Sequence, residues 1–252
     1  MYGISNLAIY IVTAIALVAL GLQVAGRATR GSVGAVWGAA AVVALAIGLW
    51  LGLIWAPPDL EMGQVQRIMY VHFPSWVGAG AAFTTAFAAS LLYLLRRNPR
   101  YDYWAHAGVE VGLVFCALGM ITGSLWGRPT WGIWWTWDPR LTSTAVMFVT
   151  FLGYLSLRAF VEDPDSRARF AAVVAIIAFV NLPIVYMSVQ WWRTLHQVQS
   201  SPDTVDIRMV MPLRTMMLAF FLLCGWMLTR RYDLARLRGD AERRFVEPEA
   251  TA

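Results

Sequence analysis

The sequence of 252 residues contains no lysine, only three histidines and only two cysteines. Cys116 and Cys224 stand singly within apolar stretches, and no CxxC or CxxCH motif occurs. The chain therefore lacks the paired thiols of a thiol–disulfide oxidoreductase and the motif that attaches c-type heme covalently. It also lacks a GxxxxGK[ST] phosphate-binding loop, so we expect that it is not an ATPase.

Charged residues are scarce as well. They make up 14% of the chain, whereas average soluble domains contain about 25%. Hydrophobic residues make up 59%, and the mean hydropathy is +0.57. The apolar residues form long blocks without the period-two alternation of a membrane β-barrel. These features predict an all-α integral membrane protein, in which helices satisfy their own backbone hydrogen bonds.

Seven apolar stretches are long enough to cross a bilayer, which takes about 20 helical residues. They comprise residues 5–26, 33–55, 74–95, 108–126, 141–160, 171–189 and 212–229. We interpret the first as a retained helix rather than a cleaved signal peptide, because no basic residue precedes it and Arg27 and Arg30 follow it. The chain thus divides into an extra N-terminal membrane segment (1–31), a membrane domain (32–232) and a tail (233–252).

The basic residues, all arginine, are unevenly distributed between the two sides of the predicted bundle. Fourteen of the 20 lie on the side of the C-terminal tail, and six lie on the other side. The positive-inside rule therefore places the C-terminus in the cytoplasm and the amino end outside. The net charge of +5 requires no nucleic-acid partner, and membrane lipid is the expected surrounding.

The outer connection 126–140, WGRPTWGIWWTWDPR, is exceptionally rich in tryptophan. Five tryptophans fall within twelve residues: Trp126, Trp131, Trp134, Trp135 and Trp137. An aromatic belt at a membrane interface does not require such a cluster in a single loop. Large rigid rings suit a large, flat, apolar ligand instead, and Gly127 and Gly132 would allow the backbone to approach it.

His72 and His196 are predicted in the two outer connections that flank the tryptophan cluster. Each lies near a predicted helix end and has aromatic neighbours. Imidazole is a common axial ligand of heme iron. We therefore predict that these two residues ligate one non-covalently bound heme b from opposite sides. The alternative is that each is only a hydrogen-bonded residue at the membrane interface.

Heme also carries two propionates, which suit the planar guanidinium of arginine. Arg128 and Arg140 border the tryptophan cluster and are candidates for this contact, although contact with lipid phosphates would also explain them. Asp138 has three candidate roles. It could cap the helix that begins near Leu141, pair with Arg140, or orient a ring N–H.

The third histidine, His106, is predicted near the cytoplasmic end of the fourth segment. It precedes Glu110 by four residues, so both side chains share one helix face. A structural pair is the favoured interpretation. Because ionisable residues within a membrane are functional candidates, a role in proton or heme uptake is the alternative.

Three runs in the sequence resemble a known family of heme-handling proteins. WGRPTWGIWWTWDPRLTS (126–143) is similar to the tryptophan-rich WWD signature of a superfamily that includes cytochrome c maturation proteins C and F and the CcsA-type synthetases. The WDPRLTS ending, MYVHFPSW (69–76) and NLPIVYMSVQWWRTLHQ (181–197) resemble the protein C family. The resemblance implies a six-helix core, formed by the second to seventh segments, in a bacterial inner membrane with loop 126–140 in the periplasm.

The resemblance also implies the roles of residues and partners. His72 and His196 match the family's axial ligands, and residues 126–138 match its heme platform. The implied partners are membrane subunits A, B and D and the periplasmic heme chaperone, protein E, which captures heme through its own histidine. The extra first segment departs from the family pattern. It is either a variation or a substitute for the single-helix protein D.

Two other functions remain open. A CcsA-like synthetase would itself join heme to CxxCH thiols, but the chain is short and has no large outer domain. A b-type electron carrier would place histidines at two depths within its helices, whereas only the outer side has a pair here. We therefore expect that the chain binds and presents heme without catalysing bond formation.

Overall fold

The structure, a computed structural model, describes residues 32–196 and 206–246. All regular elements in these ranges are helical. Six stretches are long and apolar enough to cross a membrane: Gly34–Trp55, Gln64–Arg96, Pro99–Trp131, Pro139–Phe160, Pro164–Trp191 and Ile207–Glu242. The all-α membrane fold and its six-helix core are thereby confirmed. The predicted first segment, 5–26, lies outside the described residues.

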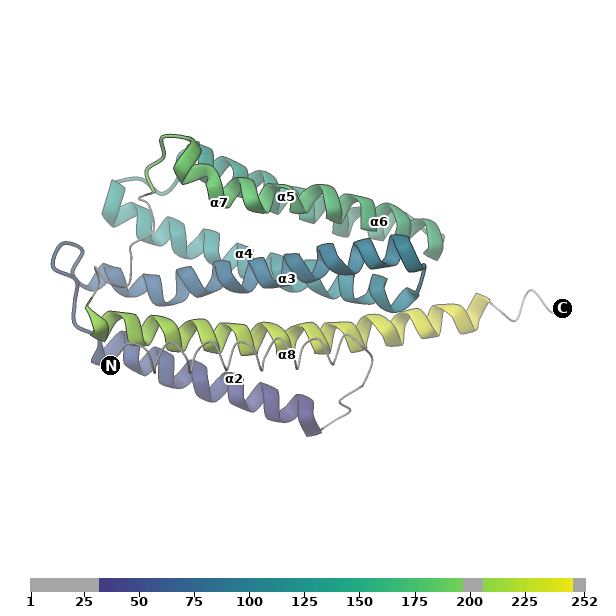
Figure 1. The fold of residues 1–252 in the computed structure, drawn as a ribbon, viewed down its shortest axis with the longest axis horizontal. Coiled ribbons are helices and arrows are strands. Elements are labelled where there is room, and N and C mark those ends of the chain that lie inside the picture. Colours follow the sequence, from purple (N-terminus) through teal and green to yellow (C-terminus); the bar gives the residue numbers. More distant parts are fainter. Residues whose placement is uncertain (1–31, 197–205, 247–252) are drawn as a thin grey trace.

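These six stretches run alternately in opposite directions through the bundle (Figure 1). The helices are α2 (Ser32–Trp50), the π-helical turn η1 (Leu51–Trp55), the 3-10 helix η2 (Gln64–Ile68), α3 (Met69–Arg96), α4 (Pro99–Trp131), α5 (Pro139–Phe160), α6 (Pro164–Phe179), α7 (Asn181–Trp191) and α8 (Ile207–Val246). One end of the bundle carries the α4–α5 connection and the C-terminal end of α7, and we call it the tryptophan end. The opposite end carries the α3–α4 and α5–α6 connections, and we call it the arginine end.

Three helices begin with the same N-terminal capping arrangement. Asn98, Asp138 and Asp163 each precede a proline, and each side chain accepts a hydrogen bond from a backbone N–H in the first turn. The side chain satisfies an N–H that has no partner within the helix, while proline at the first position has no N–H to satisfy. These caps determine where α4, α5 and α6 start, and therefore the length of the connections that precede them.

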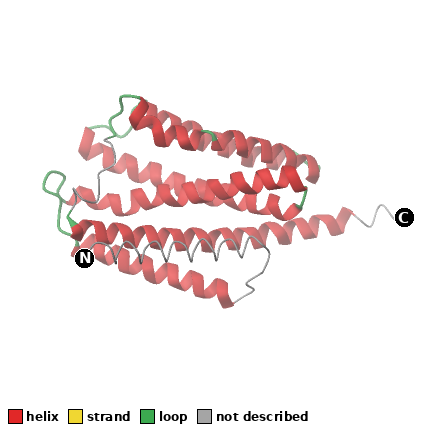
Figure 2. Ribbon diagram, in the orientation of Figure 1, coloured by secondary structure: helices red, strands yellow, loops and turns green. Residues whose placement is uncertain are grey.

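Helices α3 and α4 form the middle of the bundle, with α5, α6 and α7 on one side and α2 and α8 on the other (Figure 2). Glycine on α4 allows the two central helices to approach closely. A Cβ atom at Gly108 would lie 2.7 Å from the Ala82 carbonyl oxygen, and one at Gly112 would lie 2.4 Å from the Phe83 ring. The Phe83 ring in turn stacks on Phe151 of α5, with ring centroids 3.9 Å apart.

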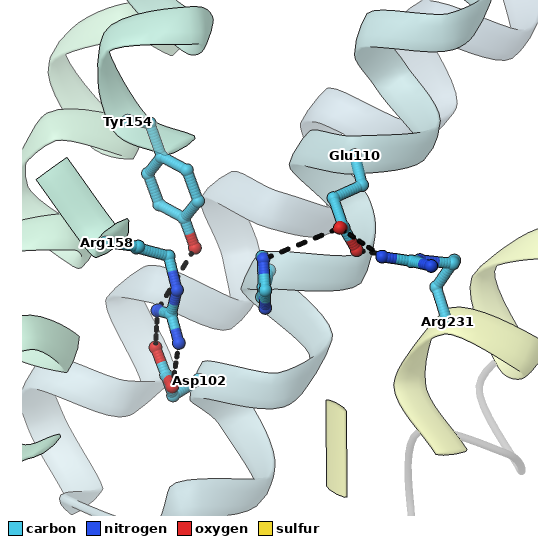
Figure 3. Close-up of polar contacts among 6 residues, drawn as sticks. Asp102, Glu110, Tyr154, Arg158 and Arg231 are labelled. Atoms are coloured by element: carbon cyan, nitrogen blue, oxygen red, sulfur yellow. Dashed lines mark hydrogen bonds and ion pairs between the residues drawn. The ribbon is translucent and has the colours of Figure 1, made fainter. Parts of the chain in front are cut away.

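Ion pairs join the helices at the arginine end (Figure 3). Arg158 of α5 donates to both carboxylate oxygens of Asp102 on α4, at 2.6 and 2.9 Å, and both side chains are about one-tenth exposed. Arg231 of α8 pairs with Glu110 of α4. The expected contact between His106 and Glu110 is present, with Nε2 of the imidazole 3.7 Å from the carboxylate. Ion pairs thus join α4 to α5 on one side of the bundle and to α8 on the other.

Several helices are longer than their apolar stretches. Helix α3 begins at Met69, so His72 lies in a helix and not in a loop as expected, and α4 continues through Trp131. Helix α8 has 40 residues, which corresponds to about 60 Å and exceeds the hydrocarbon thickness of about 30 Å. Backbone hydrogen bonding continues into polar sequence, because lipid determines where a segment must be apolar but not where its helix ends.

The buried ion pair should stabilise the bundle more than an exposed pair does. Changing Asp102 to Ala would leave the Arg158 charge buried without its partner, and we expect a loss of about 3–5 kcal/mol. The control is Glu242→Ala, because Glu242 is 49% exposed in its pair with Arg167 and such pairs contribute about 0–1 kcal/mol. Unfolding in detergent measures both variants, and equal destabilisation would contradict this assignment.

Candidate functional site

A cavity lies at the tryptophan end between α3, α4, α5, α7 and the connections that follow α4 and α7. It contains about 600 Å³ of space not filled by atoms, part of which is open to the surroundings. Six of the residues predicted from the sequence line it: His72, Trp131, Trp134, Trp135, Arg140 and His196.

The remaining predicted residues surround this cavity without lining it. Trp126 is set edge-on against His72, with ring centroids 5.6 Å apart. Arg128 donates to the carbonyl oxygen of Gly132 beyond the end of α4. Trp137 is 75% exposed at the outer surface. Asp138 acts through hydrogen bonds to its neighbours.

His72 is held in a fixed orientation by α3 and α4. Its Nδ1 lies 3.0 Å from the Gly119 carbonyl oxygen and 3.1 Å from the Thr122 hydroxyl. Because a carbonyl oxygen can only accept a hydrogen bond, Nδ1 carries the proton and Nε2 carries the lone pair. The indole N–H of Trp76 donates to Nε2 at 3.3 Å. The lone pair that could bind a metal ion is therefore on Nε2.

Asp138 links the α4–α5 connection to the segment that carries His196. Its Oδ1 accepts from the Leu141 N–H at 2.8 Å, so the cap of α5, one of its three candidate roles, is present. Its Oδ2 accepts from the Thr194 hydroxyl at 2.5 Å and from the Leu195 N–H at 3.1 Å. Burial raises the pKa of Asp138, but these hydrogen bonds more than offset it, so the pKa lies below its usual value. Asp138 is therefore ionised at neutral pH, and its carboxylate connects the start of α5 to the Thr194–Leu195 segment.

His196 faces the cavity beside the tryptophans. Its ring centroid lies 4.9 Å from that of Trp131, and its Nδ1 lies 3.9 Å from the Asp138 carboxylate. Nδ1 is buried and has no hydrogen-bond partner among the described residues. Burial, followed by the charge of Arg140, lowers the pKa of His196 to about 4. At neutral pH the imidazole is therefore uncharged, which is the form that ligates metals.

Arg140 is the cationic group of the cavity lining. It occupies the first turn of α5, next to the Asp138 cap. Its guanidinium makes no hydrogen bond or ion pair to another residue in the part of the chain that the structure describes, although Asp138 is near enough to influence it electrostatically. Its donors therefore remain available for a carboxylate of a ligand.

Sequence reasoning missed a glycine stripe on α4 and Trp76 on α3. Gly119, Gly123 and Gly127 are spaced four residues apart and line the cavity. A Cβ atom at Gly119 would lie 2.7 Å from the Trp76 ring, and one at Gly123 would lie 3.0 Å from Cε1 of His72. The four-residue spacing of the glycines could have revealed this stripe from the sequence, because residues four apart share one helix face.

The donor set suits a heme better than a bare metal ion. Within residues 32–196 and 206–246, no three or more His, Cys, Asp or Glu side chains lie together as a metal-binding group. A heme iron already has four pyrrole nitrogens and needs at most two more ligands, which two histidines can provide. Indole rings and one guanidinium complete a lining suited to an apolar macrocycle that carries carboxylates.

Comparison with known proteins gives the family. The family described as Heme exporter protein C matches residues 11–247 of this chain. The chain belongs to this family. Heme exporter protein C family members handle heme in cytochrome c maturation, which confirms the resemblance seen in the tryptophan-rich motif. The family name describes a heme exporter component of the membrane, which is consistent with a transport or handling role.

Curated relatives match over most of their length. The Heme exporter protein C of Bradyrhizobium diazoefficiens is 40% identical over 212 residues, which cover 82% of this chain and 78% of the relative. The Haemophilus influenzae protein of the same name is 34% identical over 210 residues, covering 82% and 85%. The Escherichia coli K12 protein is 35% identical over 185 residues, covering 73% and 76%.

The glycine stripe should be required for heme handling. Changing Gly123 to Ala would press a methyl group against the His72 ring, and we expect mature cytochrome c to fall severalfold in cells that depend on this protein. The matched control is Gly153→Ala, because nothing lies within 4 Å of a Cβ atom at Gly153. Cytochrome heme staining, normalised to the amount of protein in the membrane, makes the comparison. Equal yields would show that the close contact is unimportant.

Proposed function

We propose that this protein binds one heme b non-covalently at the periplasmic face of the bacterial inner membrane and presents it to the periplasmic heme chaperone. The observation that carries the proposal is that His72 and His196, which come from distant parts of the sequence, line one cavity. Two imidazole ligands from different elements would leave the heme held by the protein without a covalent bond.

The state of each imidazole supports ligation. The proton of His72 is on Nδ1, which donates to the Gly119 carbonyl oxygen and so leaves the lone pair of Nε2 on the other side of the ring. This is the usual arrangement for a histidine that binds a metal through one nitrogen and hydrogen-bonds through the other. His196 is uncharged near neutral pH because its pKa is about 4. Neither ligand would first have to lose a proton.

The tryptophans provide the apolar surface for the macrocycle. Trp131, Trp134 and Trp135 line the cavity, and Trp134 is 57% exposed. Stacking on these rings would add to the free energy of burying the porphyrin. Arg140 would bind a propionate. Because part of the cavity is open, an edge of the bound heme would remain accessible to a second protein, as presentation requires.

The proposed orientation and partners follow from charge and family. The arginine end would face the cytoplasm by the positive-inside rule, so the tryptophan end would face the periplasm. The proposed membrane partners are subunits A, B and D of the maturation complex, of which A and B would hydrolyse ATP. This chain would provide the heme-binding surface of that complex.

The first test concerns the axial ligands. With both imidazoles bound, heme in the purified protein should be six-coordinate and low-spin. His72→Ala or His196→Ala should each open one axial position and give a high-spin or water-ligated absorption spectrum. Added imidazole should restore the low-spin spectrum of either variant, because it can occupy the vacant position.

The matched control for this test is His106→Ala. His106 lies beside Glu110 in the part of α4 nearer the arginine end and does not line the cavity, so its replacement should leave the spectrum unchanged. The ligand pair would be wrong if both single variants kept the wild-type spectrum. It would also be wrong if His106→Ala changed the spectrum as they do.

The second test concerns the tryptophan platform. Replacing Trp134 and Trp135 with Leu keeps apolar volume but removes the aromatic faces, so we expect severalfold less copurified heme at an unchanged level of protein in the membrane. Trp50→Leu is the control, because Trp50 is exposed on α2 outside the cavity. Unchanged heme content together with failed membrane insertion would instead assign these rings to anchoring at the interface.

A further inference from the structure

Trp76 lines the cavity and donates a hydrogen bond to a proposed iron ligand. It follows His72 by four residues on α3, so the two side chains share one helix face. Their rings are nearly perpendicular, at 80°, with centroids 6.1 Å apart. The indole N–H points at Nε2 of His72, with the two nitrogens 3.3 Å apart. Trp76 lies outside the tryptophan-rich connection and has no role in the function proposed above.

The position of the indole is determined by α4. Its ring lies against Gly119, where a Cβ atom would come within 2.7 Å of Cε2. The carbonyl oxygen of this same glycine accepts the proton of His72 Nδ1. One position on α4 therefore both orients the imidazole and provides the space for the residue that contacts its other nitrogen.

A neutral imidazole has only one nitrogen lone pair for bonding in the plane of its ring. Since Nδ1 of His72 carries the proton, that lone pair is on Nε2, and the structure shows it accepting from Trp76. An iron atom bound to His72 needs the same lone pair. The indole hydrogen and the iron cannot both occupy it.

We propose that Trp76 is a positioning residue whose indole N–H competes with heme iron for Nε2 of His72 and so keeps heme binding reversible. This inference rests on the proposed ligation by His72. During release, the iron–Nε2 bond breaks and the Nε2 lone pair accepts the Trp76 hydrogen bond. No proton is transferred and the oxidation state of the iron does not change.

Such competition would suit a protein that transfers its heme to another protein. Without a replacement partner, dissociation of iron would leave Nε2 of His72, in a partly buried position, without a protein hydrogen bond, which is unfavourable. The Trp76 N–H removes that penalty and stabilises the heme-free state. His196 Nδ1 has no such competitor among the described residues, since it lacks a hydrogen-bond partner and the carboxylate of Asp138, 3.9 Å away, is an acceptor.

The test compares variants at position 76 in the purified full-length protein, titrated with hemin and followed by absorption. Trp76→Phe removes the N–H, and replacement by 3-benzothienylalanine also removes it while keeping the bicyclic shape. Both should bind hemin about two- to tenfold more tightly, the factor expected for one neutral hydrogen bond. Transfer of heme to apomyoglobin should slow by a similar factor, because the iron–Nε2 bond is no longer displaced.

Two controls separate competition from packing. Trp50→Phe removes an indole outside the cavity and should change neither quantity. Combining either position-76 change with His72→Ala should abolish its effect, because the lone pair in question is then absent. An effect that persists without His72 would show that Trp76 acts through the shape of the cavity, and the inference would be overturned.

The remaining outcomes distinguish this inference from the proposal on which it rests. If the benzothienyl variant binds and releases hemin as wild type does, while His72→Ala gives the high-spin spectrum, the competition is wrong and the ligation stands. If His72→Ala keeps the wild-type spectrum, His72 is not a ligand and both ideas fail.

Discussion

The close approach of α3 and α4 is the constraint on which both the fold and the cavity depend. Glycine occurs on the α4 face that meets α3, first at Gly108 and Gly112 in the core and then at Gly119 and Gly123 beside the cavity. Between helices in lipid, packing and hydrogen bonds replace the hydrophobic effect as the source of association, so small residues at the contact matter more. The same close packing brings the Gly119 carbonyl oxygen within reach of His72.

A second constraint positions the segment that carries His196. Asp138 caps α5 with one carboxylate oxygen and binds the Thr194–Leu195 segment with the other. The residue at the end of the tryptophan motif therefore positions the short segment that carries His196. His72 is oriented by a rigid helix pair, whereas His196 depends on this one carboxylate. The two proposed ligands are thus positioned in different ways, His72 by two packed helices and His196 by hydrogen bonds from its neighbours to a single carboxylate.

Much of this arrangement could be predicted from the sequence, because the relevant signals are local. Long apolar runs predict membrane helices, and dense indoles with two outer histidines indicate a heme site. The ends of the helices could not be predicted in this way. The predicted apolar stretches begin at residue 74 and end at residue 126, but backbone hydrogen bonding starts α3 already at Met69 and extends α4 to Trp131. His72 was consequently expected in a loop.

Other features depend on tertiary register, which no single segment encodes. Arg128 was one candidate for a propionate contact, and in the structure its side chain donates to the carbonyl oxygen of Gly132 at the end of its own helix. Trp126 precedes the end of α4 and packs on His72, while Trp131 reaches the cavity. The contact of Trp76 with Nε2 requires the particular register of α3 on α4. The i,i+4 spacings were visible in the sequence, but the partner helix was not.

The central claim is that one iron is held between two imidazoles of this chain. Pulsed electron paramagnetic resonance of the ferric heme complex tests it most directly, using protein labelled with nitrogen-15 in histidine alone. The account predicts hyperfine coupling of a single low-spin iron to nitrogen-15 from two histidine rings. Coupling to only one histidine, or to none, would contradict it.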